Sequence, residues 1–260
     1  MKKFVLKGTI IENRPLNDSY YLLRVDIGKA LLKEGFQPTP GQFVQVDADV
    51  TGAFLRRPIS ICNFDETTAL MDLLVQKVGL ATDRWASYQP GDRIDLVAPL
   101  GIGFSLNLDW VGASPLLVGG GVGVAPLLYL AKRLSEKGIT PSILLGAKRS
   151  ELLVLEETFS LYGNLYYTTE NGSKGETGFV TDHSIWQQKH SSVFTCGPMP
   201  MMKAVAALAK KFNYPCEVSL ENKMACGIGA CLCCVEKTTT GHLCTCTEGP
   251  VFNIEKLLWN

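Results

Sequence analysis

Hydrophobic and polar positions follow two different patterns along the chain, and the change comes shortly after residue 100. The first part consists of short runs rich in β-branched and aromatic residues. Turn signals separate these runs, as at Pro40-Gly41 and Pro90-Gly91-Asp92. About 100 residues of this kind predict a small antiparallel barrel or sandwich. The clearest expected strands are Phe4–Ile11, Tyr20–Val25, Gln42–Val46 and Ala69–Val75.

Residues 111–215 show the pattern of alternating strands and helices. After a first apolar strand and a glycine loop, leucine and alanine recur from Leu127 to Leu134 at i, i+3, i+4 and i+7, which predicts a helix. Gly138 can end this helix. Strands that alternate with helices imply a parallel sheet. The expected strands are Pro115–Val118, Pro141–Gly146 and Val193–Thr195.

Composition narrows the classes of function. The chain has 260 residues and 46% hydrophobic residues, enough for a sizeable core. Lys plus Arg and Asp plus Glu are balanced at 25 each, so no basic field exists to attract nucleic acid or an anionic membrane surface. We find no signal-peptide core and no run of about 18 apolar residues that could span a membrane. The expected location is the cytoplasm.

Cysteines are concentrated near the C-terminus. Cys226, Cys231 and Cys234 have the spacing C-x4-C-x2-C, and Cys246 follows after eleven intervening residues. This is the spacing of plant-type [2Fe-2S] sites, which use three close cysteines and one remote cysteine. Small residues between Cys226 and Cys231 allow the backbone to wrap around a cluster and to direct N–H groups at sulfur. These four cysteines are the predicted cluster ligands.

Other interpretations of the cysteines stay open. A structural zinc site would favour two C-x2-C pairs, and only one pair is present. A disulfide framework is disfavoured in a reducing compartment, and the total of nine cysteines is odd. Cys233 and Cys244 are surplus to four ligands, either as alternative ligands or as spare thiols. Cys62 and Cys216 are expected as buried small hydrophobes.

A glycine loop, GGGVGVAP at 119–126, follows an apolar strand and opens a helix, as nucleotide-binding loops do. The match to the dinucleotide fingerprint is incomplete because Val124 stands at the third glycine position. The next strand ends in Lys148 and Arg149 rather than in an acidic residue, so these cations could pair with a 2′-phosphate. A second loop, TCGPMPMM at 195–202, also lies between a strand and a helix.

The order of motifs resembles one family. RPIS at 57–60 and VGLAT at 78–82 look like the flavin motif and the pyrophosphate-binding turn of ferredoxin-reductase-type barrels. GGGVGVAP, CGPM at 196–199, the segment SLENKMACGIGACLCCVEK and the ending CTEGPVF follow in order. Over essentially its whole length the chain is similar to the electron-transfer subunits of dihydroorotate dehydrogenase B.

The resemblance implies a multi-domain α+β fold. The expected parts are an antiparallel FAD-binding β-barrel at 1–105, a Rossmann-like α/β NAD-binding domain at 106–215 and a small C-terminal plant-type [2Fe-2S] domain at 216–260. It also implies one FAD and one [2Fe-2S] cluster per subunit, with NAD as an exchangeable substrate. Electrons would pass from the FMN of a separate catalytic subunit through the cluster and FAD to NAD+. The implied assembly is a heterotetramer of two catalytic and two electron-transfer subunits.

The resemblance also assigns cofactor-binding residues. In the flavin motif, Arg57 is expected to neutralise an FAD phosphate and Ser60 to lie beside the flavin ring, whereas Ile59 stands where the family often has an aromatic residue. Cys196 is expected near the nicotinamide. The full expected cofactor-binding set is Arg57, Pro58, Ile59, Ser60, Leu74, Val75, Gln76, Gly79, Ala81, Thr82, Gly119, Gly120, Gly121, Gly123 and Cys196.

The cofactors carry the chemistry in such a protein, so we expect neither a general base nor a nucleophile among the side chains. The three histidines, His183, His190 and His242, are expected in solvent or in loops. Competing functions are a flavin and iron–sulfur reductase subunit serving ferredoxin or sulfide, an oxygenase reductase, and a zinc-bearing binding module.

Overall fold

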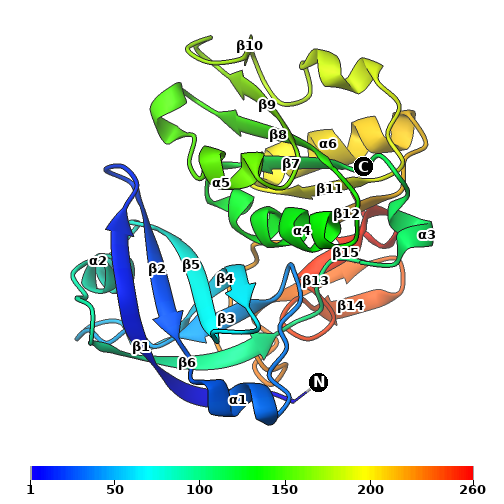
Figure 1. Cartoon of the computed structure of the whole chain (residues 1–260). Coiled ribbons are helices and arrows are strands. Elements are labelled where there is room, and N and C mark those ends of the chain that lie inside the picture. Colours follow the sequence, from blue (N-terminus) through cyan, green and yellow to red (C-terminus); the bar gives the residue numbers. More distant parts are fainter. Residues whose placement is uncertain (1, 260) are drawn as a thin grey trace. The chain divides into compact units, whose positions relative to one another are not determined.

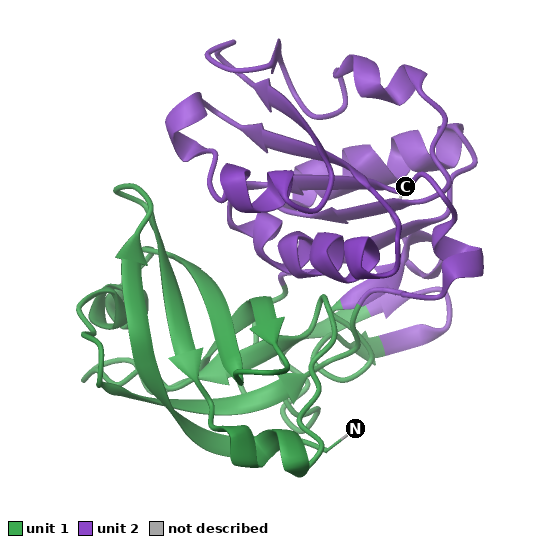
Figure 2. Ribbon diagram, viewed as in Figure 1, with its two compact units in different colours: residues 1–103, 222–236, 243–250 green, residues 104–221, 237–242, 251–260 purple. Residues whose placement is uncertain are grey.

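The computed structural model describes residues 2–259. By their internal contacts these residues form two compact units (Figure 2). Unit 1 contains residues 1–103, 222–236 and 243–250, and unit 2 contains residues 104–221, 237–242 and 251–260. The segment after residue 221 is therefore divided between the two units.

Unit 1 is built on a closed six-stranded barrel with the strand order β1-β2-β5-β4-β3-β6 (Figure 1). All neighbouring strands in the barrel are antiparallel. Closure leaves the sheet without an exposed edge. The strands are β1 Phe4–Pro15, β2 Tyr20–Asp26, β3 Phe43–Val46, β4 Arg57–Asp65, β5 Leu70–Gln76 and β6 Arg93–Leu100.

Strand β3 is buried on both of its faces. Phe43, Val44, Gln45 and Val46 are all at most 2% exposed. Because successive side chains of a strand point to opposite faces, one face is the barrel interior and the other must be covered by something outside the barrel. The C-terminal part of unit 1 supplies this cover.

Two short helices accompany the barrel, α1 Lys29–Lys33 and α2 Leu80–Ala86. Asn13 of β1 fixes the end of α2, since its side-chain Nδ2 donates to the carbonyl oxygens of Trp85, Ala86 and Tyr88 at 3.1, 3.1 and 2.9 Å. Trp85 O also accepts from Tyr88 N at 3.1 Å, so the asparagine adds a side-chain donor to the carbonyls at the C-terminal end of the helix.

Unit 2 contains a seven-stranded sheet with the order β10-β9-β8-β7-β11-β12-β15. Neighbouring strands are parallel except for β12 and β15. Strand β7 is buried along its whole length, as expected for a parallel sheet covered on both faces. The strands are β7 Leu116–Gly120, β8 Ser142–Ala147, β9 Asn164–Thr169, β10 Glu176–Thr177, β11 Val193–Cys196, β12 Cys216–Ser219 and β15 Val251–Asn253.

Two longer helices pack against this sheet: α4 contacts β7 and β11, and α6 contacts β11 and β12. Strands β13 Val235–Thr238 and β14 Gly241–Cys244 form a separate hairpin. The α-helices of unit 2 are α3 Leu108–Val111, α4 Val124–Glu136, α5 Glu156–Ser160 and α6 Met199–Lys211. The 3-10 turns are η1 Gly121–Gly123, η2 Ser150–Leu152, η3 Ser184–Gln187 and η4 Ile254–Lys256.

The predicted barrel and the predicted Rossmann-like sheet are both confirmed. Strand β12 continues the sheet beside β11, and β15 from the C-terminal tail completes it, through pairs such as Val218 with Phe252. The three-part division of the chain at 105/106 and 215/216 stays a prediction. Within residues 2–259 no helix is long and apolar enough to cross a membrane.

We predict that Asn13→Ala lowers the free energy of unfolding by about 1–3 kcal/mol, because partly buried carbonyls at and just after the end of α2 lose a side-chain donor. Asn13→Asp should destabilise the protein at least as much, since an aspartate of the same size places a carboxylate oxygen, which cannot donate, in front of these carbonyl oxygens. Thermal unfolding of the three proteins measures both effects. A fully stable Asn13→Asp variant would contradict this role of the asparagine.

Candidate cofactor and cluster sites

The predicted cluster ligands come together in unit 1, in what we call the cluster segment, residues 224–234 and 244–248. Backbone amides point at three of the four sulfurs. Cys226 Sγ accepts from Ile228 N and Cys231 N, both at 3.4 Å, and Cys246 Sγ accepts from Gly229 N at 3.2 Å. Cys231 Sγ accepts from Cys226 N at 3.5 Å. N–H groups aimed at sulfur stabilise thiolate ligands and a negatively charged cluster.

Two glycines make this wrapping possible. Gly227 and Gly229 have φ angles of +69° and +86°, a region that side chains other than glycine rarely adopt. A Cβ atom on Gly227 would also lie 2.6 Å from Gln45 Cγ, and one on Gly229 would lie 2.9 Å from Thr247 Cγ2. Both the backbone conformation and the available space therefore require glycine here.

The four predicted ligands fall into two pairs. Cys226 and Cys231 exchange amide-to-sulfur hydrogen bonds, and Cys234 and Cys246 lie together in a buried cluster of side chains. A two-iron cluster is held by two ligands on each iron, so the pairs suit it. Among the described residues no group of three or more His, Cys, Asp or Glu side chains converges as a single ion would require.

The surplus cysteines differ in their surroundings. Cys233 is exposed, and no amide is directed at its sulfur in the described structure. Cys244 packs against the buried pair Cys234 and Cys246 but is only partly buried. Position alone therefore makes Cys244, and not Cys233, the alternative to the predicted ligands.

Cys226 and Cys246 also differ electrostatically. Although burial by itself would raise the pKa of the Cys226 thiol, the amides of Ile228, Cys231 and Ala230 lower this pKa to about 6. Burial, followed by the neighbouring Cys234, raises the pKa of Cys246 to about 12. The Cys226 sulfur is thus a ready thiolate at neutral pH, whereas the Cys246 thiol is protonated and would have to lose its proton to ligate iron.

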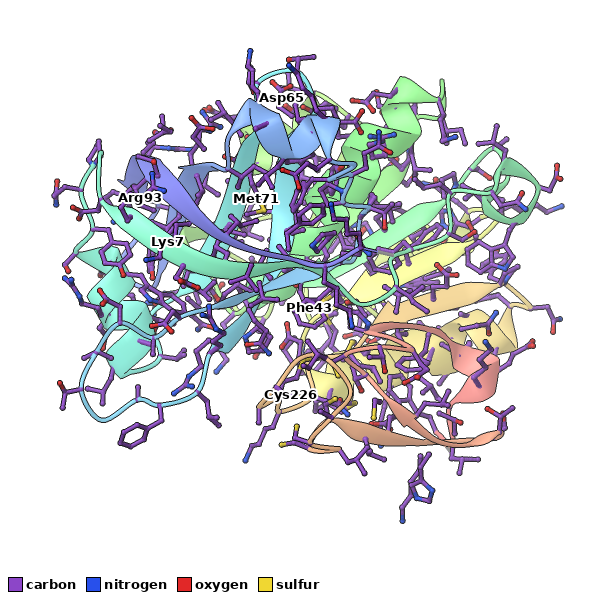
Figure 3. The ribbon with its side chains drawn as sticks, turned by 90° about the horizontal axis from the view of Figure 1, so that it is seen from below. Lys7, Phe43, Asp65, Met71, Arg93 and Cys226 are labelled. Carbon is purple, nitrogen blue, oxygen red and sulfur yellow. The ribbon has the colours of Figure 1, made fainter. Side chains whose placement is uncertain are left out.

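The cluster segment covers the outer face of β3. Phe43 packs against Cys234 and Cys246, with Leu100 of β6 beside them, and Gln45 lies against Gly227. Figure 3 labels Phe43 on this face and Cys226 in the segment. The end of the segment is held at the end of β6, where Ile102 N donates to Gly249 O at 2.5 Å. The predicted ligands are therefore fixed to the barrel itself.

Strand β4, which carries the predicted flavin motif, is the hydrogen-bonded neighbour of β3. Cross-strand pairs join Val46 to Arg57, Gln45 to Pro58 and Phe43 to Ser60, and Val44 faces Ile59. Neighbouring strands lie about 5 Å apart. The strand beneath the cluster segment is thus directly bonded to the strand that carries the flavin motif.

Arg57, the first residue of this motif, and Arg56, which directly precedes it, have different partners. Arg56 is held by an ion pair with Asp95 at 2.6 Å and lies 3.7 Å from Asp47. Arg57 donates to the backbone oxygen of Leu55 and makes no ion pair within the described residues. Arg57 is the guanidinium available for a phosphate.

The predicted pyrophosphate turn lies between β5 and α2. The Thr82 hydroxyl accepts from Val78 N and Gly79 N at 2.9 and 3.1 Å and donates to Gly79 O at 2.9 Å. Thr82 therefore holds the shape of the turn, and Ala81 is buried at 4% exposure. Pairing of β5 with β4 ends at Leu73, so the backbone of Leu74–Gln76 is paired on the β2 side only.

In unit 2 the two glycine-containing loops meet at the carboxyl ends of β7 and β11, where ligands bind in open α/β sheets. A Cβ atom on Gly123 would lie 2.5 Å from the backbone of Cys196 and Gly197. One on Gly120 would lie 2.6 Å from Met201 Sδ. Gly119 is bounded by Leu127 and Val124, and Gly121 has a φ of +57°. The loops are therefore in close backbone contact.

Cys196 is buried between the strands, opposite Ser219. Burial raises the pKa of its thiol, and the nearby Glu221 carboxylate adds to the shift. Cys196 is thus a neutral thiol at physiological pH. Beyond the next strand, Lys148 is exposed and Arg149 lies 3.7 Å from Glu151.

Sequence reasoning missed several residues at these sites. Phe43 and Gln45 were expected only as part of a strand, and Glu221 was not singled out. His183 and His190 lie in loops, as the expectation allowed, but both are buried, at 7% exposure. His183 Nδ1 accepts from Ile185 N, and His190 Nε2 contacts Ile185 O. Only position 242 is exposed as expected.

Comparison with known proteins gives two matching family models. Residues 221–258 match the iron-sulfur cluster binding domain of dihydroorotate dehydrogenase B, and residues 117–207 match the oxidoreductase NAD-binding domain. The first match contains all four predicted cluster ligands. The second contains both glycine loops.

Full-length relatives are electron transfer subunits of dihydroorotate dehydrogenase B (NAD(+)). The protein from Geobacillus sp. (strain WCH70) is 37% identical over 94% of this chain and 95% of its own length. The protein from Caldanaerobacter subterraneus subsp. tengcongensis is 37% identical over 99% of this chain and 100% of its own length. Among solved structures, a chain of NADH-dependent reduced ferredoxin-NADP oxidoreductase covers 97% of this chain with a TM-score of 0.86 and 29% identity. The ferredoxin reductase of carbazole 1,9a-dioxygenase, at 16% identity and a TM-score of 0.66, shares the fold.

We predict that Cys246→Ser abolishes cluster binding, whereas Cys244→Ser retains it. The sulfur of Cys246 receives an amide and lies in the buried pair, while no described amide is directed at Cys244 Sγ. Iron content per chain and the visible absorbance of the two matched variants measure the difference. Loss of iron in Cys244→Ser together with retention in Cys246→Ser would reverse the ligand assignment.

Proposed function

The chain belongs to the family of electron transfer subunits of dihydroorotate dehydrogenase B, and we propose that it passes electrons from the FMN of a separate catalytic subunit to NAD+. The observation that carries this proposal is the amide-lined cluster segment, with its four cysteines, packed on the same barrel that bears the flavin motif. The catalytic subunit oxidises dihydroorotate to orotate, a step of pyrimidine biosynthesis. The cytoplasm is the proposed location, in keeping with nine free cysteines.

The cofactors are one FAD and one [2Fe-2S] cluster per subunit, and NAD is the exchangeable substrate. When bound, the cluster carries single electrons, FAD exchanges either one or two, and NAD+ accepts two as hydride. The protein's contribution is to hold these groups in place and to set their potentials. In this mechanism no side chain is needed as a base or nucleophile.

For the cluster, we propose ligation by two pairs of thiolates. Cys226 and Cys231 form the more exposed pair, and Cys234 and Cys246 form the buried pair. The amides of Ile228, Gly229 and Cys231 stabilise negative charge on the sulfurs. The proposed ligands are Cys226, Cys231, Cys234 and Cys246.

For FAD, we propose that Arg57 binds a phosphate oxygen, because its guanidinium has no carboxylate partner in the described structure. Gly79 allows the pyrophosphate to approach the turn that Thr82 shapes. The one-sided pairing of Leu74–Gln76 leaves backbone groups to contact the flavin. The remaining proposed contacts are Pro58, Ile59, Ser60 and Ala81.

For NAD, we propose that the glycines of the β7–α4 loop allow close approach of the nucleotide, with Cys196 near the nicotinamide. Helix α4 begins at this loop with Val124, whose amide is used by the preceding 3-10 turn, so the space left by the glycines carries this proposal. The proposed residues are Gly119, Gly120, Gly121, Gly123 and Cys196. We further propose residues 1–105, 106–215 and 216–260 as the three functional parts, one for each cofactor.

The partner is an FMN-containing dihydroorotate dehydrogenase catalytic subunit, and the proposed complex is a heterotetramer of two copies of each subunit. A second candidate function is supported by the similarity to a chain of NADH-dependent reduced ferredoxin-NADP oxidoreductase. In that case ferredoxin would exchange electrons with the chain in place of the catalytic subunit.

We predict that the complex with the catalytic subunit reduces NAD+ at the expense of dihydroorotate, and that Cys226→Ser abolishes this coupled activity. The variant should keep FAD and should still oxidise NADH with ferricyanide, because the flavin and nucleotide sites contain no cluster ligand. Absorbance at the NADH wavelength follows both reactions. Undiminished coupling in Cys226→Ser would exclude the cluster from the path, and activity with ferredoxin alone would favour the second candidate.

A further inference from the structure

Gln45 is a buried side chain whose hydrogen-bonding groups are unused. It lies on β3 and is 0% exposed, and neither Nε2 nor Oε1 has a hydrogen-bond partner. A buried amide without partners is costly, and native proteins rarely keep one without a reason. The nearby Gln42 shows the usual arrangement: its Nε2 donates to Gly101 O at 2.7 Å, and its Oε1 accepts from Thr39 N at 2.8 Å.

The Gln45 amide faces the cluster segment. The position of a Cβ atom on Gly227 would lie 2.8 Å from Gln45 Nε2 and 3.1 Å from Cδ. Gly227 directly follows the predicted ligand Cys226. The amide is therefore in contact with the part of the backbone that wraps around the cluster site.

The alternation of side chains along β3 also places Gln45 against the cluster segment. Phe43 and Gln45 are two residues apart, so their side chains share a face, while Val44 and Val46 point to the other. Phe43 packs against the buried ligands Cys234 and Cys246. On this one face, then, Phe43 covers the buried pair Cys234 and Cys246, and Gln45 lies against Gly227, the residue after Cys226.

We propose that Gln45 is a positioning residue for the bound cluster, with its Nε2–H group donating a hydrogen bond to a sulfur atom on the barrel side of the site. Such a bond stabilises the more negative, reduced cluster and raises its reduction potential. This proposal rests on the iron–sulfur cluster of the proposed function. The side-chain amide of Gln45 then lacks a partner within the chain because its partner is the bound cluster.

The sharpest test replaces Gln45 by methionine, which has a similar volume and no amide. In the iron-loaded Gln45→Met protein, titrated anaerobically and followed by EPR, the midpoint potential of the cluster should fall. At a fixed ratio of NADH to NAD+, the ratio of reduced to oxidised cluster should drop about tenfold, which corresponds to about 59 mV for a one-electron couple. Gln45→Asn, which withdraws the amide from the segment, should shift the potential in the same direction.

A matched control separates this role from a structural one. In Gln42→Met two hydrogen bonds within the chain are lost, so thermal stability should fall while the cluster potential stays unchanged. In cluster-free Gln45→Met no bond within the chain is lost, so thermal stability should equal or exceed that of the parent chain.

Three outcomes would overturn the proposal. An unchanged cluster potential in both Gln45 variants excludes the hydrogen bond. A change only in the reduction potential of the flavin, followed by its visible absorbance, would indicate that the Gln45 amide bonds to the flavin and not to the cluster. Loss of stability in cluster-free Gln45→Met, without a change in potential, makes Gln45 a structural residue. Absence of any cluster in the parent chain would instead refute the proposed function, and iron content distinguishes that case at the outset.

Discussion

The packing of the cluster segment on the outer face of β3 is the constraint on which the arrangement of unit 1 depends. A barrel strand normally exposes alternate side chains, but β3 is buried on both faces because Phe43 contacts Cys234 and Cys246 and Gln45 contacts Gly227. The glycine at 227 follows from this packing, since a side chain there would occupy the space of Gln45. The predicted ligands are thereby held against a strand of the barrel.

This packing has a consequence for electron transfer. Because β3 is hydrogen-bonded to β4, the register between Gln45 and Pro58 fixes the cluster segment relative to the flavin motif within one barrel. The one-electron and two-electron carriers of the chain thus share a scaffold, while the nucleotide loops belong to the parallel sheet of unit 2. The chain therefore contributes position and hydrogen bonds, and the cofactors contribute the redox chemistry.

Much of this could be predicted from the sequence because it is local. The cysteine spacing, the two glycine loops and the strands around Tyr20–Val25 and Pro141–Gly146 depend on residues close together in the chain, and β2 and β8 lie there. The pairing of β12 with β15 could not be predicted from the sequence, since it joins Val218 to Phe252, residues that the cysteine-rich segment separates in the chain. Gln45 was missed for the same reason: alternation in a strand does not reveal that residues from the far end of the chain cover its outer face.

The most direct test of the account is an EPR spectrum of the anaerobically purified chain before and after addition of NADH. The account predicts that NADH produces the signal of a reduced [2Fe-2S] centre, with the flavin bleached in the same sample, because nucleotide, flavin and cluster sites on one chain are connected. A flavin that bleaches while the cluster signal appears only with dithionite would contradict that connection.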